Sequence, residues 1–290
     1  MQADTKPVSS EGLTMQAAVR RYAQTRPVRA ALLSLVIAAV LVFACLRAVD
    51  LTRWWLFTRQ LNAIERAGES GPPLEVTWRF SYRGGLVPVT VRVYPSDLSA
   101  GKALNTAWVF ESPPSVRARY VRSLVQTQSR TRLVRELSSE LHAIARRQRL
   151  DDDRFADLAA AAVQGIEYGS IGSEISLPAE MLAGGAGVCT EKSVLLAAVL
   201  LHEDYETAML VLDASNHVAV GVGSDRIGYR TLPYAFIETT RFAPIGVTSR
   251  DDLAWGPVGK PPQAIELGGA KRYGGQDEQA SSAVPEAVRE

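Results

Sequence analysis

The sequence predicts an α+β protein in which a cysteine-bearing central helix packs on an antiparallel sheet. One transmembrane helix, a β-hairpin and a helical region precede this core. Three observations lead to this class. A long uncharged segment lies near the N-terminus, as is typical of a membrane helix. Two stretches of alternating apolar residues flank a Gly-Gly pair, which predicts a hairpin. An almost wholly apolar helical segment follows Cys189, and strand-like runs come after it.

The composition argues against several classes of protein. Among 290 residues, 32 Lys and Arg nearly balance 31 Asp and Glu, which leaves a net charge of +1. No overall field therefore points to a nucleic acid or to an acidic partner. The two cysteines, Cys45 and Cys189, lie in separate segments, so the soluble part has one thiol and no internal disulfide. We expect no cofactor and no metal, because the acidic triplet at 151–153 lacks further ligand spacing and suits a helix cap better.

The uncharged segment predicts a single-pass membrane anchor over residues 29–50. Its 17 residues from 30 to 46 contain no charge, close to the minimum length that crosses a bilayer. Aromatic residues follow at 54, 55 and 57, where an interfacial belt would lie. Four arginines at 20–29 precede the segment, and this mild excess favours a cytoplasmic N-terminus and an extracytoplasmic C-terminal domain at the cell membrane.

Two alternatives to an uncleaved anchor remain open. The segment could be a signal peptide, although the 29 residues before it are long for a leader and the cleavage site is poor. "VFAC" at 42–45 faintly resembles a lipoprotein cleavage box that ends in Cys45, with Phe43 a poor fit. We expect a disordered cytoplasmic tail over 1–28 and a juxtamembrane linker over 51–73, which ends in Gly-Pro-Pro.

Residues 74–154 are expected to form the hairpin and a helical N-terminal part. Leu133, Leu137, Leu141 and Ile144 recur at helical spacing among arginines. The arginine-rich stretch 117–149 has interspersed glutamates and no aromatic stacking series, so we interpret it as a solvated helical face and expect no nucleic-acid binding.

Residues 155–255 are expected to form the core that carries chemistry. Cys189 stands where a helix begins, and a helix N-terminus favours the thiolate form of cysteine. His217 opens the apolar run "HVAVGV", whereas His142 and His202 are expected on solvated positions. Glu238 follows "YAFI", where an acid is costly to bury without a partner. Beyond this core, residues 256–290 lack apolar periodicity and are expected to form a disordered tail.

Each of these features alone is a weak signal of catalysis. A lone cysteine before an apolar helix is more often a small buried hydrophobe than a nucleophile. A lone histidine on a strand is usually a satisfied polar group. The ordered combination of the two with an acid is more specific than any member.

The quoted segments together resemble a known family. "YGSIGSEISLPAEMLAGGAGVCTEKSVLLAAVLL", "TAMLVLD", "NHVAVGVG" and "YAFIETT" are similar to the core of transglutaminase-like proteins, which belong to the papain-like cysteine superfamily. The nearest likeness is to bacterial and archaeal membrane-anchored members, and it covers about residues 155–247. Two positions depart from the family pattern. Val188 stands where relatives often have Asp, and "HEDY" at 202–205 replaces a usual Gly-Tyr turn.

The resemblance implies a papain/transglutaminase-like core and a catalytic triad of Cys189, His217 and Glu238. Such a triad supports acyl transfer or amide or peptide hydrolysis through a thioester, on a protein or peptide substrate. The residues do not select between water and an amine as the acceptor. The alternative is a catalytically inactive module of the same fold that binds or scaffolds at the cell envelope. The membrane is the expected second partner.

Overall fold

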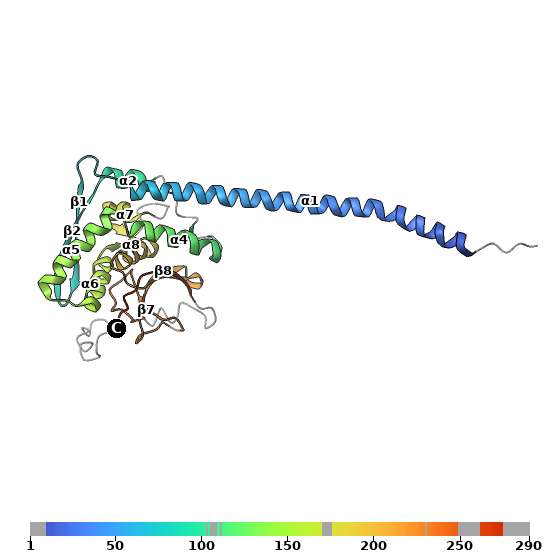
Figure 1. The fold of residues 1–290 in the computed structure, drawn as a ribbon. Helices are drawn as coiled ribbons and strands as arrows, with labels where there is room; N and C mark the ends of the chain where they lie inside the picture. The colour runs from blue at the N-terminus through green and yellow to red at the C-terminus, as the bar shows by residue number, and fades with distance from the viewer. Residues whose placement is uncertain are drawn as a thin grey trace, which may run out of the picture. The chain divides into compact units, whose positions relative to one another are not determined.

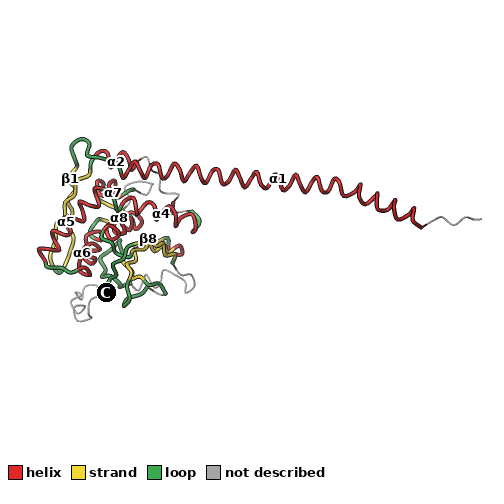
Figure 2. Tube along the Cα trace, viewed as in Figure 1, coloured by secondary structure: helices red, strands yellow, loops and turns green. Residues whose placement is uncertain are grey.

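The computed structural model describes residues 10–102, 104, 109–110, 112–169, 176–229, 231–248 and 262–274. The chain divides into two units, residues 1–56 and 57–290. Figures 1 and 2 show the elements of both, coloured along the chain and by secondary structure.

The N-terminal unit consists of one helix in the part that is described. Helix α1 runs over Ser10–Glu65 and continues into the second unit. Its segment Ala31–Glu65 contains a window of mean hydropathy 2.6, none of it buried, and is long and apolar enough to cross a membrane. The expectation of disorder over 1–28 is therefore wrong from residue 10 onward, while residues 1–9 lie outside the described part of the chain.

The expected linker over 51–73 is also wrong over most of its length, because α1 ends only at Glu65. The last turns of α1 are part of the second unit. Phe57, Leu61 and Ile64 recur at helical spacing and are buried. The ring of Phe57 packs edge-on against that of Tyr120, with the ring centroids 4.7 Å apart. These three residues form an amphipathic pattern that extends the helix to Glu65. The pattern is short, and in the sequence it is hard to distinguish from the aromatic run at 54–57.

The second unit combines six further helices and eight strands among its described residues. The helices are α2 (Pro95–Lys102), α4 (Pro114–Gln128), α5 (Arg132–Gln148), α6 (Asp152–Gln164), α7 (Pro178–Gly184) and α8 (Cys189–His202). The strands are β1 (Leu74–Tyr82), β2 (Gly85–Val93), β3 (Glu167–Tyr168), β4 (Ala186–Gly187), β5 (Thr207–Leu212), β6 (His217–Gly223), β7 (Tyr234–Ile237) and β8 (Gln263–Gly268). The α+β class is confirmed.

The predicted hairpin is confirmed as β1 and β2, which are antiparallel. Leu74 pairs with Val93 at the open end, and Tyr82 pairs with Gly85 beside the turn. Two residues with positive φ, Arg83 and Gly84, form the turn between the strands, as a two-residue hairpin requires. The hairpin contacts α5 and α6, and the side chain of Trp78 donates a 2.8 Å hydrogen bond to a carbonyl of α6. It therefore belongs to the same unit as the core.

The helices α5 and α6 form as their sequences predict. The side-chain oxygen of Asp151 accepts the amide of Arg154 at 2.9 Å and caps α6, which confirms the capping role of the acidic triplet. The apolar stripe of α5 is buried at 133, 137, 141 and 144. One arginine departs from the expected solvated face. Arg117 is only 5% exposed, and its guanidinium binds both carboxylate oxygens of Asp213, at 2.7 and 3.0 Å.

Helix α8 is the centre of the unit. Its residues 194–200 are all buried, as expected for a helix that is apolar on every face. It contacts α4, α5, α6 and α7 as well as strands β5 and β6 (Figure 1). The prediction that the cysteine helix packs on an antiparallel sheet is confirmed.

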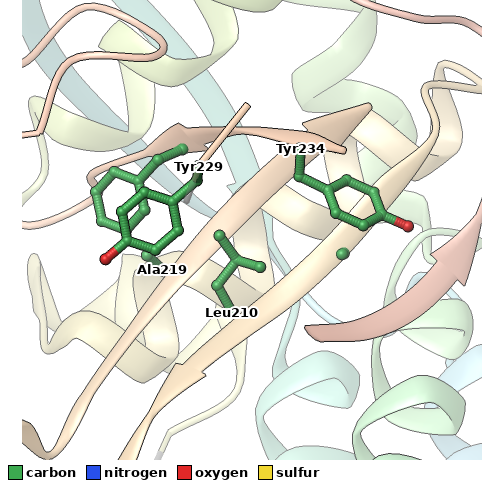
Figure 3. Close-up of a cluster of buried hydrophobic side chains, with 6 residues drawn as sticks. Leu210, Ala219, Tyr229 and Tyr234 are labelled. Atoms are coloured by element: carbon green, nitrogen blue, oxygen red, sulfur yellow. The ribbon is translucent and has the colours of Figure 1, made fainter. Parts of the chain in front are cut away.

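That sheet has the strand order β7-β6-β5-β8, and every neighbouring pair is antiparallel. All seven residues of β6 are buried, so both faces of this central strand are covered. Figure 3 shows part of the packing on one face, where Leu210 and Ala219 of neighbouring strands lie beside Tyr229 and Tyr234. The ring of Tyr229 packs on that of Phe236 with centroids 4.8 Å apart.

The fourth strand corrects a further expectation. Residues 263–268 form β8 and pair with β5, so the segment 256–290 is not wholly a disordered tail. Ile265 and Leu267 alternate with exposed residues and are buried. The strand is short and its neighbours in sequence are rich in Gly and Pro, which obscured this alternation. Residues 249–261 and 275–290 lie outside the described residues.

The segment "HEDY" at 202–205 follows the last turns of α8 and leads into β5. Asp204 has a φ of 64°, in the left-handed region that favours glycine. Its amide donates to the carbonyl of Leu201 at 3.1 Å, and the amide of Tyr205 donates to that of Leu200 at 3.0 Å. Asp204 thus adopts a backbone conformation that glycine fits better.

This strain predicts that Asp204→Gly stabilises the protein. The variant removes the Cβ that disfavours a positive φ, and we expect the free energy of unfolding to rise by about 0.5–1 kcal/mol. Urea unfolding in detergent, followed by far-ultraviolet circular dichroism, measures the change. Asp204→Ala keeps the Cβ and is the matched control, which should not stabilise. Equal stabilities of Asp204→Gly and wild type would show that the turn carries no such strain.

Candidate active site

Cys189 is the first residue of α8 and is half-buried. The helix start is held by Glu191, whose carboxylate accepts the amide of Val188 at 2.9 Å and that of Ser176 at 2.5 Å. A glutamate at the third helical position that reaches back in this way is one half of a capping box. The cap fixes the direction in which the helix begins. It places the thiol at the positive end of the helix dipole.

His217 and Glu238 come from neighbouring strands. His217 opens β6, and Glu238 follows directly after β7. Because β6 and β7 are antiparallel, the start of one lies at the same end of the sheet as the end of the other. The imidazole Nε2 of His217 lies 3.1 Å from Oε2 of Glu238. Both residues are buried, with exposed fractions of 5% for His217 and 2% for Glu238.

The second oxygen of Glu238 is held by the turn that follows it. Oε1 accepts the amides of Thr239 and Thr240, both at 2.8 Å, and the hydroxyl of Thr240 at 2.7 Å. Burial by itself raises the pKa of a carboxyl group. The hydrogen bonds and the charge of His217 outweigh that effect and lower the pKa of Glu238 to about 2. Glu238 is therefore an ionised acceptor for His217 at neutral pH.

The thiol and the imidazole shift each other's ionisation. Burial opposes the thiolate, but hydrogen bonds to His217 and to the backbone of Val218 lower the pKa of Cys189 below its usual value. Burial likewise opposes the imidazolium, but Cys189 and Glu238 together raise the pKa of His217 to about 9. Each group thus favours the charged form of the other, and His217 is an imidazolium at neutral pH. Since the pKa of His217 lies above the unfolded value of 6.5, its stabilising contribution is complete below pH 6.5 and is lost as the pH rises through about 9.

The three residues singled out in the sequence therefore meet at one end of the sheet. The other histidines lie elsewhere. His142 on α5 is half-exposed, pairs with Glu203 at 2.8 Å and stacks on Phe155. His202 is exposed at the end of α8, as expected.

Sequence reasoning missed two buried polar residues beside this site. Lys192 is fully buried one turn along α8, and its ammonium donates to the carbonyls of Gln164 and Ile166 at 3.2 and 2.7 Å. Burial lowers the pKa of Lys192 to about 8, although the charge of Glu238 acts in the opposite direction. The side-chain amide of Gln164 in turn donates to the carbonyls of Glu238 and Ala243 at 2.8 and 2.9 Å. The sequence did contain a sign of these two residues. A lysine and a glutamine occupy helix positions at which the periodicity requires apolar residues.

An exposed aromatic residue lies beside the same centre. Tyr168 belongs to β3, which pairs in parallel with β4 immediately before Cys189. Its side chain is 57% exposed. Burial and the negative charges of Cys189 and Glu238 raise the pKa of Tyr168.

Metal binding has no obvious place among these residues. In the ranges that the structure describes, no group of three His, Cys, Asp or Glu side chains is arranged to hold a metal ion. The donors of the site itself, one thiol, one imidazole and one carboxylate, are engaged with one another.

The electrostatics predict the effect of Glu238→Gln on His217. The neutral amide stabilises the imidazolium less than a carboxylate does, so the pKa of His217 should fall from about 9. Titration of the imidazole by NMR measures the shift. Glu203→Gln removes the partner of His142 and is the matched control, which should leave His217 unchanged. An identical His217 titration in wild type and Glu238→Gln would contradict the electrostatic coupling.

The comparisons with known proteins agree with this fold. A family model described as a transglutaminase-like domain matches residues 130–227. The matched range includes Cys189 and His217 and ends before Glu238. A search of curated proteins and a search of solved structures each returned no match. Residues 130–227, which lie in the second unit, are therefore similar to a transglutaminase-like domain.

Proposed function

We propose that this chain is a membrane-anchored thiol enzyme that performs acyl transfer or amide hydrolysis through a Cys-His-Glu triad. The observation that supports it most is the junction of three side chains at the start of α8. Cys189 lies close enough to His217 for the imidazole to lower the pKa of the thiol, and His217 lies 3.1 Å from a buried, ionised Glu238. In this proposal Cys189 is the nucleophile, His217 the acid and base, and Glu238 the group that orients the imidazole.

The first half of the reaction forms a thioester. The Cys189 thiolate attacks the carbonyl carbon of a protein or peptide amide, and a carbon–sulfur bond forms. The carbonyl oxygen takes up the negative charge, which backbone amides at the start of α8 can stabilise. The carbon–nitrogen bond then breaks as the imidazolium of His217 gives its proton to the departing amine.

The second half regenerates the thiolate. Neutral His217 takes a proton from the incoming nucleophile, which attacks the thioester carbonyl and displaces the sulfur. Water as the nucleophile releases a carboxylic acid, and a primary amine forms a new amide. Glu238 stays ionised throughout because its pKa is about 2. It holds Nε2 of His217, which leaves the other ring nitrogen for the sulfur.

The triad predicts a pattern among variants. Cys189→Ala and His217→Ala should each reduce turnover by about 10³–10⁶-fold, and the double variant should lose no more, because the residues act as a unit. Glu238→Gln should lose less, since the nucleophile and base remain. Release of ammonia from a glutamine-containing protein and incorporation of a fluorescent primary amine measure the two outcomes.

His142→Ala is the control for these variants, because it removes a histidine that also pairs with a glutamate. It should retain activity. Alkylation of Cys189 by iodoacetamide tests the same triad without a substrate, and His217→Ala should raise the midpoint of its pH profile. A profile unchanged by His217→Ala would favour a non-catalytic binding or scaffold module.

We also propose that α1 anchors the protein with its N-terminus in the cytoplasm and the second unit outside. The helix is long and apolar enough to span a bilayer. Arg20, Arg21, Arg26 and Arg29 precede the apolar segment, and Arg47, Arg53 and Arg59 follow it. This small excess of positive charge supports the orientation.

The orientation predicts a pattern of protease protection. Protease added to intact spheroplasts should digest residues 57–290 and spare an epitope tag at the N-terminus. Lysed spheroplasts are the control, in which both parts become accessible. Protection of residues 57–290 in intact spheroplasts would reverse the assignment, and recovery of the protein in the soluble fraction would contradict the anchor.

A further inference from the structure

Ser193 contacts the elements that carry all three members of the proposed triad. It lies on α8, one turn after Cys189, and is fully buried. Its hydroxyl donates to the carbonyl of Val218 at 3.0 Å and lies 3.1 Å from the hydroxyl of Thr239. Val218 directly follows His217, and Thr239 directly follows Glu238. One side chain on the helix of the nucleophile thus holds the two other segments.

The protons of these hydroxyls are fully used. Ser193 has one proton, which goes to the carbonyl of Val218, so its oxygen accepts the proton of Thr239. The Thr239 hydroxyl also lies 3.5 Å from the carbonyl of Cys189 at the helix start, so its single proton is shared between that carbonyl and the oxygen of Ser193. Both residues are 0% exposed. A buried hydroxyl is costly unless it is bonded, so this pair of hydrogen bonds favours the observed arrangement.

Val218 is held from two directions. Its backbone lies close enough to Cys189 to lower the pKa of the thiol, and its carbonyl accepts the hydroxyl of Ser193 at 3.0 Å. A shift of β6 along α8 would break both contacts. Such shifts matter because catalysis depends on positioning to within a fraction of an ångström.

We propose that Ser193 is a positioning residue, whose hydroxyl together with that of Thr239 fixes α8 against β6 and the end of β7 so that Cys189, His217 and Glu238 stay aligned. This role rests on the function proposed above. Ser193 touches neither substrate nor reacting atoms and acts only through its neighbours.

The test is the pH profile of Cys189 alkylation by iodoacetamide in the full-length protein in detergent. Mass spectrometry of the peptide that contains Cys189 separates it from Cys45. Ser193→Ala and Thr239→Val each remove one hydroxyl at nearly constant volume. Each should raise the midpoint of the profile by about 0.5–1 pH unit, which slows alkylation below the midpoint about 3–10-fold. The double variant should shift the midpoint no further than either single one, because the two hydroxyls form one unit.

Two further variants separate positioning from general loosening of the core. Thr239→Ser keeps the hydroxyl and should keep the wild-type profile. Thr207→Val removes an equally buried hydroxyl from β5 and is the matched control. Thr207 pairs with Val222, at the opposite end of β6 from His217. It should leave the midpoint unchanged even where it lowers the melting temperature. An equal shift in Thr207→Val would overturn the positioning role.

The outcomes distinguish this inference from the proposed function. A low wild-type midpoint that rises in His217→Ala but not in Ser193→Ala or Thr239→Val would overturn the role of Ser193 alone. An ordinary wild-type midpoint that His217→Ala does not change would overturn the triad and the positioning role with it. If Ser193→Ala does not fold, Ser193→Cys, which keeps the volume but bonds weakly, and Thr239→Val give the same decision.

Discussion

The burial of α8 is the constraint on which the rest of the second unit depends. Five large apolar side chains between positions 194 and 200 are almost fully buried. Each contributes about 1.5–3 kcal/mol relative to exposure, so together they approach the net stability of a typical domain. A helix that is apolar all round needs cover on every side, which helices α4, α5 and α6 and strands β5 and β6 provide. Its N-terminus remains partly accessible, and Cys189 lies there.

Charged groups inside this apolar surrounding are stable because each has a fixed partner. Glu238 is held by two backbone amides, a hydroxyl and His217. Lys192 is held by the carbonyls of Gln164, the last residue of α6, and of Ile166 just beyond it. A buried charge without such partners would be strongly destabilising. The same bonds that offset the cost of burial also set the ionisation of Glu238 and His217. Stability and the proposed chemistry therefore depend on one network.

The elements that the sequence predicted well are those with long or regular patterns. The hairpin, the apolar stripe of α5, the acidic cap of α6 and the cysteine helix each follow from spacing within one segment. The errors fall where the pattern is short or depends on a partner. The end of α1 is helical because Phe57 packs against Tyr120, and β8 is a strand because β5 offers an unpaired edge. Neither partner is visible from the segment itself.

The sequence by itself determined which residue types are available for chemistry. These are a thiol at a helix start, a histidine at the opening of one apolar strand and an acid directly after a second apolar strand. These are local properties, because helix and strand periodicity and the cost of burying a charge are encoded in neighbouring residues. Only the tertiary structure decided that the three meet. The antiparallel pairing of β6 and β7 brings His217 beside Glu238, and the packing of α8 on β6 brings Cys189 to His217. Contacts between segments this far apart depend on register and packing, so Ser193, Lys192 and Gln164 acquire their roles only in the folded chain.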